Sequence, residues 1–198
     1  MRALKQIAIR GCAWALLLTG AAVAQAQEFS FHLDPAQSNV QFTLGDVLHT
    51  VHGTFRLKDS TVRLDPATGK ASGAIIVDAT SGNTQNDTRD RQMHKEVLES
   101  AKYPEIVFTL QSIQGNLPTI GSSDVKLSGV MRIHGNEHPL TVTVPVQVAN
   151  GRASADVHFA VPNVQWGMKD PSTFVLRVSK EVQIDVHCIG SLVENPKP

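Results

Sequence analysis

The eight histidines are the residues of this chain best suited to bind a metal, and two pairs of them are closely spaced. His49 and His52 are three residues apart on an expected strand, so their side chains point to opposite faces and cannot share a metal. His134 and His138 flank a turn and could come close, but the sequence places no third ligand beside them. We therefore predict no metal site and no cofactor.

The sequence gives no sign of a catalytic nucleophile. Its two cysteines are Cys12 and Cys188, and Cys12 falls in a segment that we expect to be removed, which excludes an intramolecular disulfide. Cys188 alternates with Val186 and Ile184, as expected of a small buried apolar residue. The apolar face of the expected strands carries no titratable pair. No catalytic residue is predicted, and we do not expect an enzyme.

Residues 1–26 have the features of a signal peptide. Arg2, Lys5 and Arg10 precede an apolar run from Cys12 to Val23, and small residues follow it at the spacing of a cleavage site. The run is about a dozen residues, shorter than the roughly 20 that a membrane-spanning helix needs. We expect export to the periplasm, or secretion, of a single soluble domain of residues 27–198 without an integral membrane segment.

The composition favours an all-β domain. The 198 residues carry 18 basic and 18 acidic side chains, so no strong positive field is available to gather nucleic acid or a membrane surface. Val and Thr recur, and apolar side chains alternate with polar ones over eight or more segments. These segments lie near residues 40–44, 51–57, 62–64, 75–77, 106–110, 125–133, 140–148, 157–161, 174–178 and 182–188. Short turns between them indicate antiparallel neighbours.

One helix is expected between two of the strands. Asn86 or Asp87 can cap its start, and Met93, Val97 and Leu98 form an apolar stripe. The helix is expected to end before Tyr103-Pro104, and its place in the chain predicts that it caps or flanks the sheet.

About eight antiparallel strands with one apolar face form either a sandwich or a closed barrel. A barrel of this size is filled by side chains or is just wide enough for one ligand. The inward residues are mostly Val, Ile and Leu, with few large rings, which favours a hollow interior. A filled core remains the alternative, because Val-rich walls also pack well.

Several motifs, in order, resemble those of the YceI-like family of bacterial exported proteins, over about residues 29–190. They are Leu33-Asp34-Pro35, Val51-His52-Gly53-Thr54-Phe55, the run from Asp78 to Thr84, Tyr103-Pro104-Glu105-Ile106-Val107-Phe108, and Leu127 to Gly135. The resemblance implies an extended, lipocalin-like antiparallel barrel that binds a polyisoprenoid in an apolar channel. At Val164–Met168 the charged residues of many members are absent, although the aromatic residue and the glycine are kept.

The expected ligand site follows from the apolar alternation. An isoprenoid lipid of the quinone or polyprenyl type would be held by burial of its chain, at about 0.8 kcal/mol for each methylene. The bulky residues expected to contact the chain are Phe42, Phe55, Phe108, Met131, Phe159 and Trp166, with Met93, Val97 and Leu98 sealing the channel from the helix.

Arg89 and Asp90, near the helix start, have two interpretations. The guanidinium could bind a phosphate or quinone oxygen of the ligand with two hydrogen bonds, at a helix end that favours negative charge. Alternatively, the two residues lock the helix to the barrel.

Two other functions stay open from the sequence. An enzyme could act on a lipid or quinone inside the channel, or a filled-core stress protein could bind a partner on its surface. Whether the chain forms a homodimer is also left open.

Overall fold

Ten β-strands, one short α-helix and one π-helical turn form the described part of this computed structural model, residues 27–45, 50–172 and 178–196. The strands are β1 (Gln27–Leu33), β2 (Asn39–Gly45), β3 (Thr50–Leu57), β4 (Thr61–Asp65), β5 (Lys70–Asn83), β6 (Glu105–Gln114), β7 (Gly121–Ile133), β8 (Asn136–Ala149), β9 (Arg152–Val161) and β10 (Val182–Pro196). The predicted all-β class with one helical segment between strands is confirmed. The predicted signal peptide, His49 and apolar positions 174 and 176 lie outside the described residues.

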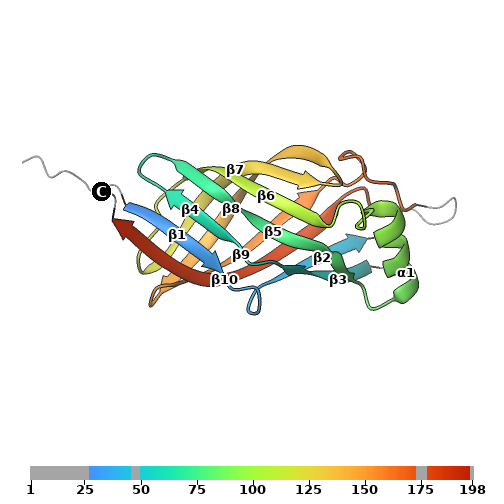
Figure 1. Ribbon diagram of the computed structural model, residues 1–198, viewed down its shortest axis with the longest axis horizontal. Coiled ribbons are helices and arrows are strands. Elements are labelled where there is room, and N and C mark those ends of the chain that lie inside the picture. The colour runs from blue at the N-terminus through green and yellow to red at the C-terminus, as the bar shows by residue number, and fades with distance from the viewer. Residues whose placement is uncertain (1–26, 46–49, 173–177, 197–198) are drawn as a thin grey trace, which may run out of the picture.

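The strands close into an antiparallel barrel with eight positions around its circumference, as predicted. Six positions are taken by β5, β6, β7, β8, β9 and β10, which pair in that order. The other two positions are each divided between two short strands. β1 and β2 follow one another along β10, while β4 and β3 follow one another along β5. Figure 1 shows the result as an elongated barrel, with α1 at one end and the start of β1 at the other.

Ser60 holds the two divided positions together. The N–H of Leu33, at the end of β1, donates to Ser60 O at 2.9 Å. The Ser60 hydroxyl accepts from the N–H of Ile76 on β5 at 3.1 Å and donates to Lys58 O at 3.0 Å. These bonds replace ladder hydrogen bonds that are lost where the strands are interrupted.

β8 and β9 pair over a short stretch only. Their register covers Val146–Ala149 with Arg152–Ala155, next to the turn that joins them. Beyond it β8 continues to pair with β7, and β9 with β10. Pro139 and Pro145 lie in the part of β8 that pairs with β7 alone. Proline is tolerated in a sheet where its missing N–H does not face a paired strand, so both residues suit this seam between β8 and β9.

The predicted helical segment is present but changes its helix type along its length. α1 covers Asp87–Gln92, and the Asn86 side chain caps it by accepting from the Arg89 N–H. The chain then changes to a π-helical turn, η1 (Met93–Val97), in which the Leu98 N–H donates to Met93 O at 2.9 Å. Glu99 has a positive φ of 45° and stops the helix well before Tyr103-Pro104. The helical segment thus ends before Tyr103-Pro104, as predicted, although Glu99 and not that dipeptide ends it.

Within the described residues, no helix is long and apolar enough to cross a membrane.

Candidate functional site

A cavity of about 210 Å³ lies inside the barrel. Thirty of the described residues line it, and every strand contributes at least one of them. All are apolar except Ser154, and none carries a charge at neutral pH. The alternation seen in the sequence thus produces a continuous apolar inner wall.

The two ends of the barrel are packed more tightly than its middle. One cluster contains Ile113, which is fully buried, and Val125, and the other contains Leu33 and Leu98. Between the clusters, inward-facing side chains are only half-buried, among them Ile75, Leu127, Phe108, Val157 and Phe159. Since these residues point inward, their exposed surface faces the cavity. The barrel therefore has the hollow interior that the sequence favoured, and not the filled core that was the alternative.

Four of the six bulky residues predicted to contact a ligand line the cavity: Phe55, Phe108, Met131 and Phe159. Phe42 is buried but not part of the lining, because its ring lies over Gly53 and packs against the Phe55 ring at a centroid distance of 5.2 Å. Trp166 is also outside the lining and stacks on His138.

The predicted sealing residues Met93, Val97 and Leu98 pack in the hydrophobic cluster at the helix end. Gly82 on β5 lets this segment approach closely: a Cβ there would lie 2.6 Å from Phe55 and 2.7 Å from Met93. The His94 ring adds two hydrogen bonds of 2.9 Å, to Gly82 O and to the Ser100 hydroxyl. Because a carbonyl only accepts, the Gly82 contact places the proton on Nε2.

Arg89 and Asp90 both contact Thr84, the buried residue that follows β5. Arg89 donates to Thr84 Oγ1 at 2.8 Å and to Thr84 O at 2.9 Å. Asp90 Oδ1 accepts from the Thr84 N–H at 2.9 Å and from its hydroxyl. These contacts tie α1 to the end of β5, which is the arrangement that the lock interpretation expects.

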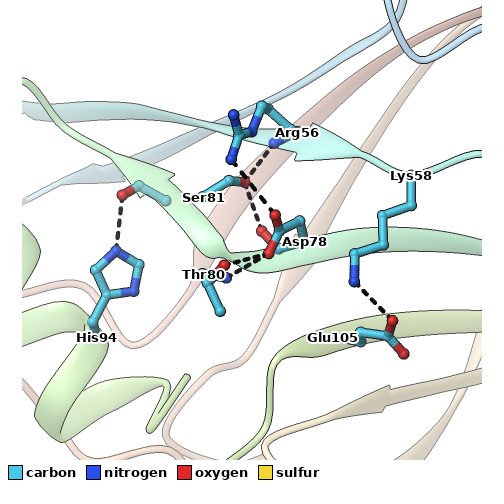
Figure 2. A network of polar contacts seen from close by, with 8 residues as sticks. Arg56, Lys58, Asp78, Thr80, Ser81, His94 and Glu105 are labelled. Atoms are coloured by element: carbon cyan, nitrogen blue, oxygen red, sulfur yellow. Dashed lines mark hydrogen bonds and ion pairs between the residues drawn. The ribbon is translucent and has the colours of Figure 1, made fainter. Parts of the chain in front are cut away.

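The run from Asp78 to Gly82 forms a bulge in β5, at the point where β5 turns toward the helix. Arg56 of β3 pairs with Asp78, but Thr54 pairs with Asn83, so extra residues stand out from the β5 side. Ser81 Oγ accepts from the Arg56 N–H at 2.8 Å and donates to Asp78 O at 2.6 Å, which closes the bulge. Figure 2 shows this network.

Asp78 is the ionised centre of that network. The Thr80 hydroxyl, which donates to Asp78 Oδ1 at 2.6 Å, holds the pKa of the carboxyl below its usual value. The Thr80 N–H at 3.0 Å, Lys58 and Arg56 act in the same direction, while partial burial opposes them. Lys58 in turn donates to Glu105 of β6 at 2.8 Å, so the charges join β3, β5 and β6.

Two buried polar atoms lie at the helix end of the barrel without a hydrogen-bond partner: His138 Nε2 and Asn163 Oδ1. The His138 ring is stacked on Trp166, with ring centroids 4.3 Å apart and an interplanar angle of 1°. Asn163 is 3 % exposed. Neither residue was predicted from the sequence to face inward. For His138 the available signal was its position two residues before inward-facing Leu140 on the same strand, whereas Asn163 lies in the turn after β9, where alternation gives no signal.

Cys188 lines the cavity, in agreement with its predicted place on the apolar face. Burial raises the pKa of its thiol to about 11, and the negative charge of Asp156 contributes to the increase. A thiol in this environment stays protonated at neutral pH, so it is a poor nucleophile.

His134 and His138 have different partners, and the His138 ring stacks on Trp166. His134 Nε2 instead contacts Glu99 Oε2 at 2.7 Å, and its ring packs against Tyr103. Across the described ranges, no three His, Cys, Asp or Glu side chains are grouped so that they could hold a metal ion.

The cavity can hold an apolar molecule. A dry apolar cavity of about 150 Å³ is already large enough to bind benzene. With a larger volume and almost no polar group on its wall, this cavity favours a hydrocarbon chain over water.

Residues 31–189 match the protein family described as the YceI-like domain. No curated protein matches the sequence.

Solved structures with a similar fold include BcnA of Burkholderia cenocepacia (22 % identity, TM-score 0.65, covering 79 % of this chain and 98 % of that one). A polyisoprenoid binding domain of Saccharophagus degradans, implicated in plant cell wall breakdown, is 18 % identical with a TM-score of 0.65, covering 81 % and 97 %. The YceI protein of Campylobacter jejuni is 17 % identical with a TM-score of 0.57, covering 76 % and 87 %.

Proposed function

Because the chain belongs to the YceI-like family and encloses an apolar cavity, we propose that it binds an isoprenoid lipid of the quinone or polyprenyl type and carries or sequesters it. The observation that carries this proposal is the composition of the cavity wall, in which a single residue of the thirty is polar. The polyisoprenoid binding domain of Saccharophagus degradans, which has the same fold, supports the choice of ligand class.

The energetics favour a chain of several isoprene units. Burial contributes about 0.8 kcal/mol per methylene, so a fully buried five-carbon unit contributes roughly 4 kcal/mol. Binding costs an estimated 4 to 15 kcal/mol in lost freedom of the ligand. One unit therefore offsets at most the lowest of these costs, three units offset most of the range, and about four units exceed it. No charged contact is needed along the chain.

The rival functions find less support in the described residues. A filled-core protein would have no internal cavity, and a cavity of about 210 Å³ is present. An enzyme acting inside the channel would need a titratable pair on the inner wall. Of the lining residues only Cys188 titrates, and burial keeps it protonated.

The place of action is part of the proposal. Residues 1–26 serve as a signal peptide, and the protein carries its ligand in the periplasm. N-terminal sequencing of the exported protein is expected to give a start at Gln25 or Gln27. An intact N-terminus would contradict the proposed export.

Lipid extraction tests the binding function. The protein purified from its host is expected to release an isoprenoid that mass spectrometry identifies. Val157→Asp, which places a carboxylate on the cavity wall, should abolish lipid retention, whereas Ala160→Asp on the outer face of β9 should retain it. Ala155→Phe narrows the cavity without adding charge and should also lower retention. Equal lipid content in all variants, or no isoprenoid in the wild type, would overturn the proposal.

A further inference from the structure

We infer that His138 and Asn163 bind the hydroxyl of a neutral head group at the helix end of the cavity. The inference rests on the proposed function, since it assigns a polar end to the lipid whose chain occupies the apolar wall. It selects among isoprenoids: a prenyl alcohol or a hydroquinone fits this end, and a prenyl diphosphate does not.

The position of the two residues follows from the inward rows of β8 and β9. On β8, Leu140, Val142 and Val144 line the cavity, and His138 is the next residue in that row. On β9, Phe159 and Val161 line the cavity, and Asn163 lies in the turn that follows the end of this strand.

The turn after β9 brings Asn163 toward His138. Asn163 lies in this turn, in which the Trp166 N–H donates to Pro162 O at 2.9 Å. The stacking of Trp166 on His138 confirms that the segment after β9 reaches the start of β8. Met131, the partner of His138 on β7, lines the cavity.

A polar group of the ligand would supply the hydrogen bonds that two buried atoms lack. Asn163 Oδ1 and His138 Nε2 are buried and form no hydrogen bond, either with each other or with other groups. Buried polar atoms are nearly always paired, because leaving them unpaired is costly. A hydroxyl meets both needs at once, since its hydrogen can be donated to Asn163 Oδ1 while its oxygen accepts from the His138 Nε2–H tautomer.

The charges near this end disfavour a diphosphate. No lysine or arginine is among the described residues that line the cavity. Near this end, Lys169 already contacts Glu96 at 2.6 Å and His134 contacts Glu99 at 2.7 Å. A diphosphate would therefore enter a buried site without a compensating cation, which is strongly unfavourable.

Three probes with the same fifteen-carbon chain test the inference: farnesol, farnesyl diphosphate and the hydrocarbon farnesene. Their dissociation constants can be measured on the delipidated protein by quenching of Trp166, since the other tryptophan, Trp14, lies in the predicted signal peptide. Farnesol is expected to bind about 10- to 100-fold more tightly than farnesene, and more tightly than the diphosphate. Equal affinity for farnesol and farnesene, or tighter binding of the diphosphate, would overturn the inference.

Two variants assign the preference to residues. His138→Phe keeps a ring against Trp166, and Asn163→Leu keeps the side-chain volume. Each should reduce the preference for farnesol about tenfold or more while farnesene binding stays the same. The matched control His158→Gln, on the exposed outer face of β9, should keep the wild-type preference. A preference that survives both variants contradicts the assignment.

The result also separates the inference from the proposed function. If farnesol and farnesene bind equally well, the apolar chain site stands and only the head-group assignment fails. If none of the three probes binds, the proposed function itself fails. Should a variant not fold, the ranking of the three probes on the wild type still decides the inference.

Discussion

Phe108 and Phe29 both point into the barrel, but only Phe108 lines the cavity. Phe29 is 3 % exposed in the packed end of the barrel, whereas Phe108 is half-buried beside open volume. Phe29→Ala should therefore cost the roughly 3 to 5 kcal/mol of a core truncation, and Phe108→Ala clearly less. Urea unfolding of the two variants, with their lipid content, measures this. Equal losses of stability would contradict a hollow middle, and Phe108→Ala should be the variant that loses lipid.

Asp78 makes the stability of the barrel depend on acid pH. Its pKa is lower in the folded protein than its ordinary value, mainly because of the Thr80 hydroxyl, so it stabilises the fold above that ordinary value. The contribution is lost as the pH falls through the lowered pKa. Asp78→Asn should cost roughly 1 kcal/mol at pH 7, since the carboxylate is partly screened by solvent, and much less near pH 2. A constant difference between wild type and variant at both pH values would exclude this role.

The sequence predicts whether a single residue faces into the barrel wherever apolar and polar side chains alternate along a strand. Phe55, Phe108, Met131 and Phe159 were predicted as inward-facing and line the cavity. Trp166 lies in a turn after β9, where no period applies, and its stacking on His138 could not be predicted. The Thr84 contacts of Arg89 and Asp90 depend on the β5 bulge, which leaves no periodic signal either.

At the scale of elements, the seam between β8 and β9 predicts uneven protection of backbone amides. In Arg152–Ala155 both edges of β9 are paired, whereas from Asp156 to Val161 only the edge facing β10 is paired. Hydrogen exchange followed by NMR should therefore find alternating residues protected in 156–161, and the others exchanging quickly. Uniform protection along β9 would mean that β8 and β9 are joined over their full length. β10, paired on both edges over Gln183–His187, is the internal control.

The strand segments and their antiparallel order could be read from alternation and turns, but the divided positions and the seam could not. Alternation reports which face a residue lies on, and it carries no information about the strand on either side. Pro139 and Pro145 were the available signal for the seam, because a proline in a strand indicates an unpaired edge. The change from α1 to η1 was also hidden, since Met93, Val97 and Leu98 suit either helix type.

The hollow interior is a property of the whole molecule. It depends on whether all inward side chains together fill the space that eight strands enclose, and small differences in side-chain volume and strand tilt decide the outcome. A wall rich in Val, Ile and Leu was compatible with both outcomes, so the sequence favoured the hollow barrel without deciding it. The structure supplies the missing quantity, a cavity of about 210 Å³.

A ligand inside such a barrel should stabilise the whole fold, because it binds the folded chain and not the unfolded one. At a free ligand concentration 100 times the dissociation constant, the gain is about 2.7 kcal/mol, which for a chain of this size raises Tm by roughly 5 to 10 °C. Delipidated protein should therefore melt lower than protein as purified and recover when farnesol is added. Ala155→Phe, with its cavity narrowed, should show less of this shift. EDTA should leave Tm unchanged, because the described residues hold no metal-binding group. An unchanged Tm on delipidation would show that a ligand in the interior does not stabilise the fold, and a loss of Tm with EDTA would show that a bound metal does.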